Sequence, residues 1–180
     1  RRLATSPLAE IAASLDNDLQ QAALSLRPEL GERLDALTAA GAFGAAVSGS
    51  GPTCFGLFPD RSSADAAAAE LHGALVAELR AALTHDRVRA EPLELALYKR
   101  DASNMEGRAA VVCFPTSTAE VQACVRAARR HGRPFVARGS GTGLAGGAVP
   151  LGDPVVIVTT KMDRVLEIVA RTPYQTWEAA

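Results

Sequence analysis

The chain has 180 residues and a formal net charge of −1, and 48% of its residues are hydrophobic although only 4% are aromatic. The hydrophobic content is sufficient for a core of small side chains. The small net charge argues against a nucleic acid or an anionic membrane as a partner recruited by bulk charge. No apolar run approaches the ~20 residues that a membrane span requires. The composition indicates a cytoplasmic protein with one ordinary domain or two small ones.

Three cysteines, Cys54, Cys113 and Cys124, lack the spacing of metal ligands. We expect buried, reduced thiols and no metal site. The sequence begins at Arg1 rather than at a methionine, which we take to indicate a piece cut from a longer reading frame.

The first part of the chain predicts helices followed by a short hairpin. Ala and Leu recur among polar residues at helical spacing over 8–26, and Pro28 opens a second helix whose leucines repeat every three or four positions. Strands are expected over 42–47 and 53–58, on either side of a glycine-containing turn.

A long apolar stripe follows this hairpin. It continues from Ala67 to Leu83 at a spacing of four residues, with Ser62 as the expected N-cap. Gly73 lies in its middle, where glycine costs ~1 kcal/mol relative to alanine. We therefore interpret the stripe as the end of one helix joined to the start of another, with a junction within 70–76.

The second part of the chain has a strand–helix–strand pattern. Ser117 and Glu120 form a capping box that begins the helix, and Gly132 is its expected C-terminal cap. The predicted strands cover 109–114, 134–137, 155–158 and 165–168.

The most informative segment follows the second of these strands and reads Arg138-Gly139-Ser140-Gly141-Thr142-Gly143-Leu144-Ala145-Gly146-Gly147-Ala148. Glycine leaves the backbone bare, so successive N–H groups can converge on one anion, typically a diphosphate. The segment formally matches the dinucleotide fingerprint, including an acidic residue, Glu167, about 20 residues farther on. Two prolines and no helical period follow it, whereas a Rossmann loop must open a helix. We therefore expect a backbone nest between strands, with the Ser140 and Thr142 hydroxyls as additional donors.

Residues from about 76 to 168 resemble a known family in an ordered series of motifs. Tyr98-Lys99-Arg100-Asp101, Val111-Val112-Cys113-Phe114-Pro115 and the stretch from Arg133 to Gly147 are similar to the amino-terminal part of FAD-linked oxidases. The family includes the flavin-binding chain of glycolate oxidase and the D-lactate dehydrogenases of the vanillyl-alcohol-oxidase type. The resemblance implies a PCMH-type FAD-binding subdomain, and hydride transfer from a 2-hydroxy acid to flavin N5.

The cofactor-binding residues that this resemblance implies lie in the glycine-rich loop, which wraps the FAD pyrophosphate. They are Arg138, Gly139, Ser140, Gly141, Thr142, Gly143, Leu144, Gly146 and Gly147. The family continues with a second FAD subdomain and a substrate domain that carries the catalytic groups, whereas 169–180 does not resemble the family and stays unassigned. We therefore expect a partial FAD site and assign no catalytic residue.

A second glycine turn, Val47-Ser48-Gly49-Ser50-Gly51-Pro52-Thr53, belongs to a different pattern. Together with Asn17-Asp18-Leu19-Gln20 and Leu26-Arg27-Pro28-Glu29-Leu30, it resembles the carboxy-terminal end of GHMP kinases, specifically 4-diphosphocytidyl-2-C-methyl-D-erythritol kinase of isoprenoid biosynthesis. The resemblance implies that Ser48, Gly49, Ser50 and Gly51 lie beside nucleotide phosphates. The ATP loop and catalytic Asp of that family belong upstream, and Asp16 and Asp18 are expected to cap a helix. ATP is therefore not expected as a cofactor.

The sequence thus predicts an α+β chain in two parts, a ferredoxin-like GHMP kinase fragment at 1–72 and a β-α-β FAD-binding subdomain at 73–168. Three hypotheses stay open: a partial FAD-binding module of a flavin-dependent 2-hydroxy acid oxidoreductase, a kinase remnant that binds nucleotide weakly, and an inactive fusion with an empty loop. FAD or another diphosphate is the expected ligand. Unpaired sheet edges predict self-association.

Overall fold

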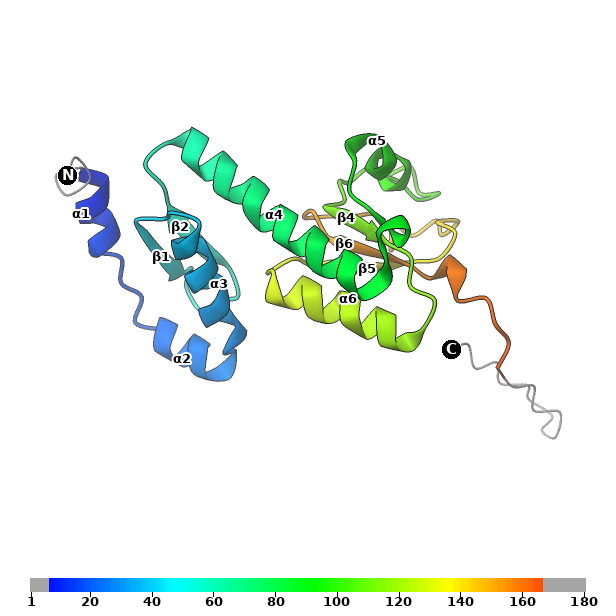
Figure 1. Ribbon diagram of the computed structural model, residues 1–180, viewed down its shortest axis with the longest axis horizontal. Coiled ribbons are helices and arrows are strands. Elements are labelled where there is room, and N and C mark those ends of the chain that lie inside the picture. The colour runs from blue at the N-terminus through cyan, green and yellow to red at the C-terminus, as the bar shows by residue number, and fades with distance from the viewer. Residues whose placement is uncertain (1–6, 167–180) are drawn as a thin grey trace. The chain divides into compact units, whose positions relative to one another are not determined.

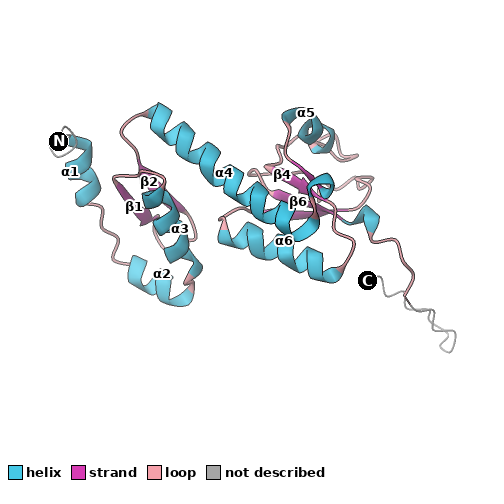
Figure 2. Cartoon of the chain, in the orientation of Figure 1, coloured by secondary structure: helices cyan, strands magenta, loops and turns pink. Residues whose placement is uncertain are grey.

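The computed structural model describes residues 7–166, and these adopt the predicted α+β fold (Figure 1, Figure 2). The chain divides into two compact units. The first contains the chain up to Leu75 together with Arg129–Gly132, and the second contains the rest. None of the helices within residues 7–166 combines the length and apolar character needed to span a bilayer.

The first unit is built from helices and a two-stranded antiparallel hairpin. Its elements are α1 (Pro7–Ala13), α2 (Gln20–Leu26), α3 (Glu29–Ala39), β1 (Gly44–Val47), β2 (Cys54–Leu57) and the first part of α4 (Arg61–Leu83). Helix α3 packs on both strands of the hairpin. Leu30 of α3 is fully buried against Ala23 and Val47. These contacts form the small core of this unit.

The continuous helical stretch predicted over 8–26 is interrupted between α1 and α2. The cause is Asn17, whose Oδ1 accepts a hydrogen bond from the Leu19 N–H at 3.1 Å. Asn17 Nδ2 donates to the carbonyls of Val47 at 2.7 Å and Gly49 at 2.9 Å. An Asn side chain that bonds nearby backbone competes with the helix for those groups. The break therefore depends on contacts made far along the chain.

The start of two helices differs from the sequence prediction. Asp16 and Asp18 were expected to cap the helix, but among the described residues ahead of α2 it is the Asn17 side chain that bonds the backbone. At α4, Asp60 Oδ1 accepts the Ser63 N–H at 2.8 Å. The helix begins at Arg61, two residues earlier than a cap at Ser62 would require, so the capping position falls on Asp60.

The long apolar stripe forms one continuous helix, α4, of 23 residues. Its buried residues include Ala67, Leu75, Leu79 and Leu83. The division between the two units falls inside this helix, between Leu75 and Val76.

The second unit is built around a four-stranded mixed sheet with the order β3-β4-β6-β5. Its strands are β3 (Val88–Arg89), β4 (Val111–Cys113), β5 (Phe135–Arg138) and β6 (Val155–Val158), and its α-helices are α5 (Pro92–Leu95) and α6 (Thr118–Arg130). Strand β6 pairs in parallel with β4 and β5, whereas β3 pairs antiparallel with β4. Every residue of β6 is buried, as expected for a central parallel strand covered on both faces.

The two faces of this sheet pack against different segments, and Figure 1 shows α5 and α6 on opposite sides of it. On one face, Val112 and Val156 pack with Tyr98, which follows α5. On the other face, Cys113 lies against Cys124 of α6, and both thiols are buried and free. The hydrogen bond with Cys124, together with burial, raises the pKa of the Cys113 thiol.

The strands predicted over 109–114, 134–137 and 155–158 are confirmed within one or two residues at each end. The strand predicted over 165–168 lies partly outside the described residues. Strand β3 carries no sequence signal, because two residues are too few for an alternating pattern.

Candidate functional site

The glycine-rich loop begins where β5 ends and reaches β6 through residues 139–154, which contain no helix. The expectation that no Rossmann helix follows the loop is confirmed. Gly141 and Gly146 have φ angles of +80° and +76°, which L residues rarely adopt. An anion bound at this loop would therefore be held by the loop's own amide groups rather than by a helix N-terminus.

The backbone amides of residues 140–147 differ from the loop's carbonyls in their hydrogen bonding. None of the N–H groups of residues 140–147 donates a hydrogen bond to another described residue. The loop's carbonyls, in contrast, are engaged: Gly141 accepts from the Ala102 N–H at 3.0 Å, and Gly146 accepts from the Val149 N–H at 3.2 Å. The loop is thus fixed through its acceptors while its donors stay available to a ligand.

Space is also available around the loop. A Cβ added to Gly139, Gly143 or Gly147 would meet no atom within 4 Å beyond the neighbouring residues. The hydroxyls of Ser140 and Thr142 lie 3.3 Å apart and are exposed. Hydroxyl and amide donors on one open loop form a donor set that suits phosphate oxygens.

Arg138, at the start of the loop, is only 9% exposed. Its Nη1 donates to the Arg100 carbonyl at 2.8 Å, and its guanidinium carbon lies 5.7 Å from the centroid of the Tyr98 ring. The guanidinium also lies where a Cβ on Gly141 would be. The side chain therefore supports the loop, and its role as a cofactor ligand stays a prediction.

Asp101 is a buried acidic residue beside the loop, 7% exposed. Its Oδ1 accepts hydrogen bonds from the N–H and hydroxyl of Ser103 at 2.9 and 2.5 Å, and its Oδ2 accepts from the Ala148 N–H at 3.3 Å. The hydrogen bonds from Ser103 hold the pKa of the Asp101 carboxyl below its usual range. Its contact with the loop was not predicted, although Asp-x-Ser at 101–103 is typical of a turn closed by the Asp side chain.

Two backbone amides of the kinase-like turn between β1 and β2 bond within the turn itself. The Ser48 N–H donates to the Thr53 carbonyl at 2.8 Å, and the Gly51 N–H donates to the Ser48 carbonyl at 3.1 Å. Just before the turn, the Val47 N–H donates to Gln20 Oε1 at 2.9 Å. The proposed contact of nucleotide phosphates with Ser48, Gly49, Ser50 and Gly51 stays a prediction.

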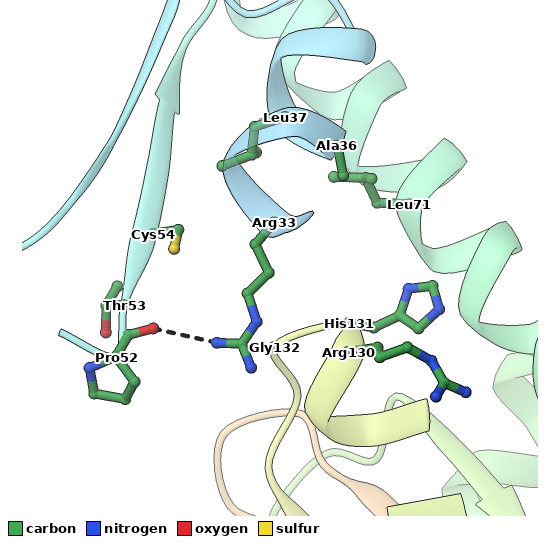
Figure 3. A pocket seen from close by; sticks show the side chains of 10 residues that line it. All are labelled: Arg33, Ala36, Leu37, Pro52, Thr53, Cys54, Leu71, Arg130, His131 and Gly132. Atoms are coloured by element: carbon green, nitrogen blue, oxygen red, sulfur yellow. Dashed lines mark hydrogen bonds between the residues drawn. The ribbon is translucent and has the colours of Figure 1, made fainter. Parts of the chain in front are cut away.

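A cavity of about 290 Å³ lies beside this turn in the first unit (Figure 3). Its lining residues are Arg33, Ala36, Leu37, Pro52, Thr53, Cys54, Leu71, Arg130, His131 and Gly132. Arg33 Nη1 donates to the Pro52 carbonyl at 3.3 Å, and burial raises the pKa of the Cys54 thiol. Arg33 therefore stabilises the end of the turn.

Within residues 7–166, His, Cys, Asp and Glu side chains do not gather in any group of three or more that could hold a metal ion. The loop with its available amide donors is the strongest candidate site among these residues.

Two family models match the chain in separate segments. Residues 3–77 match the model of the GHMP kinases C terminal, and residues 109–179 match the model of an FAD binding domain. The chain is therefore chimera-like, with one part similar to kinases and the other similar to flavoproteins.

The curated relatives of the first part are 4-diphosphocytidyl-2-C-methyl-D-erythritol kinases. The chain is 64% identical to the Thermobifida fusca enzyme over 52 residues, which cover 29% of this chain and 17% of that protein. It is 53% identical to the Nocardia farcinica enzyme over 75 residues, which cover 42% of this chain and 24% of that protein. The chain thus spans less than a quarter of the length of either relative.

Among solved structures, the chain is similar to the 4-ethylphenol oxidase from Gulosibacter chungangensis. The sequence identity is 29% and the TM-score is 0.49, and the match covers 56% of this chain and 20% of that one.

Proposed function

We propose that the second part of the chain is a partial FAD-binding module of a flavin-dependent 2-hydroxy acid oxidoreductase of the glycolate or lactate type. The observation that carries this proposal is the row of N–H groups on residues 140–147, which have no hydrogen-bond partner within residues 7–166. The match of 109–179 to an FAD binding domain supports FAD as the ligand. Converging backbone N–H groups are a common means of holding a diphosphate.

The residues present fit this cofactor. The N–H groups of residues 140–147 and the Ser140 and Thr142 hydroxyls would hold the diphosphate, and the open glycines would let it approach the backbone. FAD, when bound, would supply the acceptor for a hydride taken from the 2-hydroxy acid. The chain's own contribution is to bind and orient the cofactor, and the proposal includes no catalytic residue.

The test is flavin retention by purified protein that has been incubated with FAD and desalted. The wild-type chain should keep the visible absorbance of bound flavin, and Gly141→Asp should lose it. At φ +80°, a side chain on residue 141 is strained and collides with the Arg138 guanidinium, and its carboxylate repels a diphosphate.

The matched control is Gly49→Asp, which places the same residue at a positive φ of +56° in the kinase-like turn. This variant should retain flavin like the wild type. A wild type without flavin, or equal retention by both variants, would contradict the proposal. Retention of ADP but not FAD, lost in Gly49→Asp alone, would instead support the kinase remnant.

A further inference from the structure

We infer that Asp101 is a positioning residue for the glycine-rich loop, and that it prepares the loop amides for a diphosphate by holding the Ala148 end in place. The inference rests on the proposed function of the loop. It assigns a role to a residue outside the glycine motif.

We call residues 99–108, which surround Asp101, the latch segment. This segment contacts the first residues of the glycine-rich loop. The Ala102 N–H donates to the Gly141 carbonyl at 3.0 Å. The Arg100 carbonyl accepts from Arg138 Nη1 at 2.8 Å. The first bond uses a loop carbonyl, which a ligand anion would not need, so it fixes the loop without occupying its amide donors.

The latch segment also contacts the far end of the loop. Asp101 Oδ2 accepts the Ala148 N–H at 3.3 Å, and the Arg108 N–H donates to the Pro150 carbonyl at 2.8 Å. Residues 140–147, whose amides bond no other described residue, lie between these two anchored ends. The latch segment thus restrains the loop on both sides of its donor row, which reduces the entropy lost when a ligand orders it.

Asp101 is itself held in one orientation. Its Oδ1 accepts two hydrogen bonds from Ser103, which directs Oδ2 to Ala148. The carboxylate is buried, and the hydrogen bonds from Ser103, with a smaller contribution from the positive charge of Arg138, hold its pKa below its usual range. A buried, fully engaged carboxylate is costly to replace by a group that satisfies only part of its partners.

Charge alone predicts the opposite effect on ligand binding. A carboxylate near a bound diphosphate repels it, so removal of the Asp101 charge should tighten FAD binding if electrostatics dominates. Loss of the Ala148 anchor should instead weaken binding. The sign of the change in FAD affinity therefore separates positioning from charge.

The first measurement is the FAD dissociation constant of wild type, Asp101→Asn and a matched control, Asp153→Asn. Asp153 is paired with Arg108 through two bonds of 2.6 Å, but it accepts no hydrogen bond from the amides of residues 140–148. Asp101→Asn should weaken FAD binding about tenfold, as expected for loss of a hydrogen bond to a charged group. Asp153→Asn should change the affinity by less than about twofold. Unchanged or tighter binding by Asp101→Asn would overturn the inference.

The second measurement is amide hydrogen exchange in FAD-free protein. Asp101→Asn should speed exchange at Ala148 while the amides of β4 and β6 keep wild-type protection, which separates a local release from general destabilisation. Equal exchange at Ala148 in both proteins would overturn the inference. If the wild type binds no FAD, the proposed function fails. Faster exchange at Ala148 in Asp101→Asn would still support the role of Asp101 in holding Ala148 in place.

Discussion

The two glycine loops of this chain look alike in sequence but differ in what their backbone amides do. In the turn between β1 and β2, the Ser48 and Gly51 N–H groups close the turn itself. In the loop after β5, the N–H groups of residues 140–147 have no partner among the described residues. Glycine content therefore does not define an anion site. An anion site is defined by the availability of N–H donors. This availability depends on which neighbouring segments hydrogen-bond to the loop carbonyls.

The two units also differ in how their cores are built. The first has a two-stranded hairpin stabilised by Leu30 with Ala23 and Val47, whereas the second surrounds the fully buried strand β6. A small core concentrates its stability in few residues, because less apolar area is buried on folding. Perturbation of the first unit should thus affect stability strongly and leave the loop after β5 able to bind.

The largest expected effect comes from the core of the first unit. Leu30→Ala should lower the free energy of unfolding by about 2–5 kcal/mol, because it removes a fully buried side chain and leaves a cavity. Urea unfolding measures this. The matched control is Leu26→Ala, since Leu26 is 82% exposed, and its effect should stay within about 0.5 kcal/mol. Equal losses in the two variants would contradict the assigned core.

An acid-sensitive ion pair in the second unit should have the next largest effect. Arg87 donates to both carboxylate oxygens of Glu120, at 2.6 and 2.9 Å, and lowers the pKa of Glu120 from 4.5 to about 2. Because the folded state has the lower pKa, this stabilisation is complete above pH 4.5 and is lost as the pH falls towards 2. It should amount to roughly 1–3 kcal/mol, and Glu120→Gln should remove it.

The measurement is the unfolding free energy of wild type and Glu120→Gln as a function of pH. The difference between them should shrink as the pH falls through this window. Glu94→Gln is the matched control, because Glu94 pairs with Arg89 at 3.3 Å in a half-exposed position. A constant difference between wild type and Glu120→Gln across the window would show that the pair does not titrate as described.

Asn17 offers a third test, directed at the kinase-like turn. Asn17→Ala removes the bonds to the Val47 and Gly49 carbonyls and should cost about 1–2 kcal/mol. Asp18→Ala, next to it, should have little effect. Flavin retention should be the same in both variants, because the change lies in the other glycine loop. Loss of flavin in Asn17→Ala would mean that the two loops do not act separately.

The smallest predicted effect concerns Gly73 in α4. A Cβ at this position meets nothing within 4 Å, so Gly73→Ala should stabilise the protein by about 0.5–1 kcal/mol through its helix propensity. Gly41→Ala is the opposite control, because φ at Gly41 is +96° and a side chain there is strained. Thermal unfolding compares them, and destabilisation by Gly73→Ala would argue against a continuous α4.

The sequence predicts those features that depend on local pattern. Leucine repeats after Pro28 indicate α3, and apolar runs indicate β4 and β6, because each pattern reflects the period of its own element. The absence of a helix after the glycine-rich loop was also predictable from its prolines. These signals require no knowledge of distant contacts.

The features that the sequence did not predict depend on partners far along the chain. Asn17 ends a helical pattern by bonding residues 30 and 32 positions away. Asp101 reaches Ala148, 47 residues farther on. Such contacts leave no periodic signal, because they arise only after the sheet has brought the segments together. The glycines predict a row of N–H donors at the candidate site. They do not predict the contacts with Asp101 and Ala102 that hold the loop in place.

The most direct test is a two-dimensional amide NMR spectrum of the labelled protein, recorded during titration with FAD. The amide signals of residues 140–147 should shift in parallel with the bound fraction, while those of Ser48, Gly49, Ser50 and Gly51 stay in place. Shifts confined to the turn between β1 and β2, or no shift in either loop, would contradict a diphosphate site at the loop after β5.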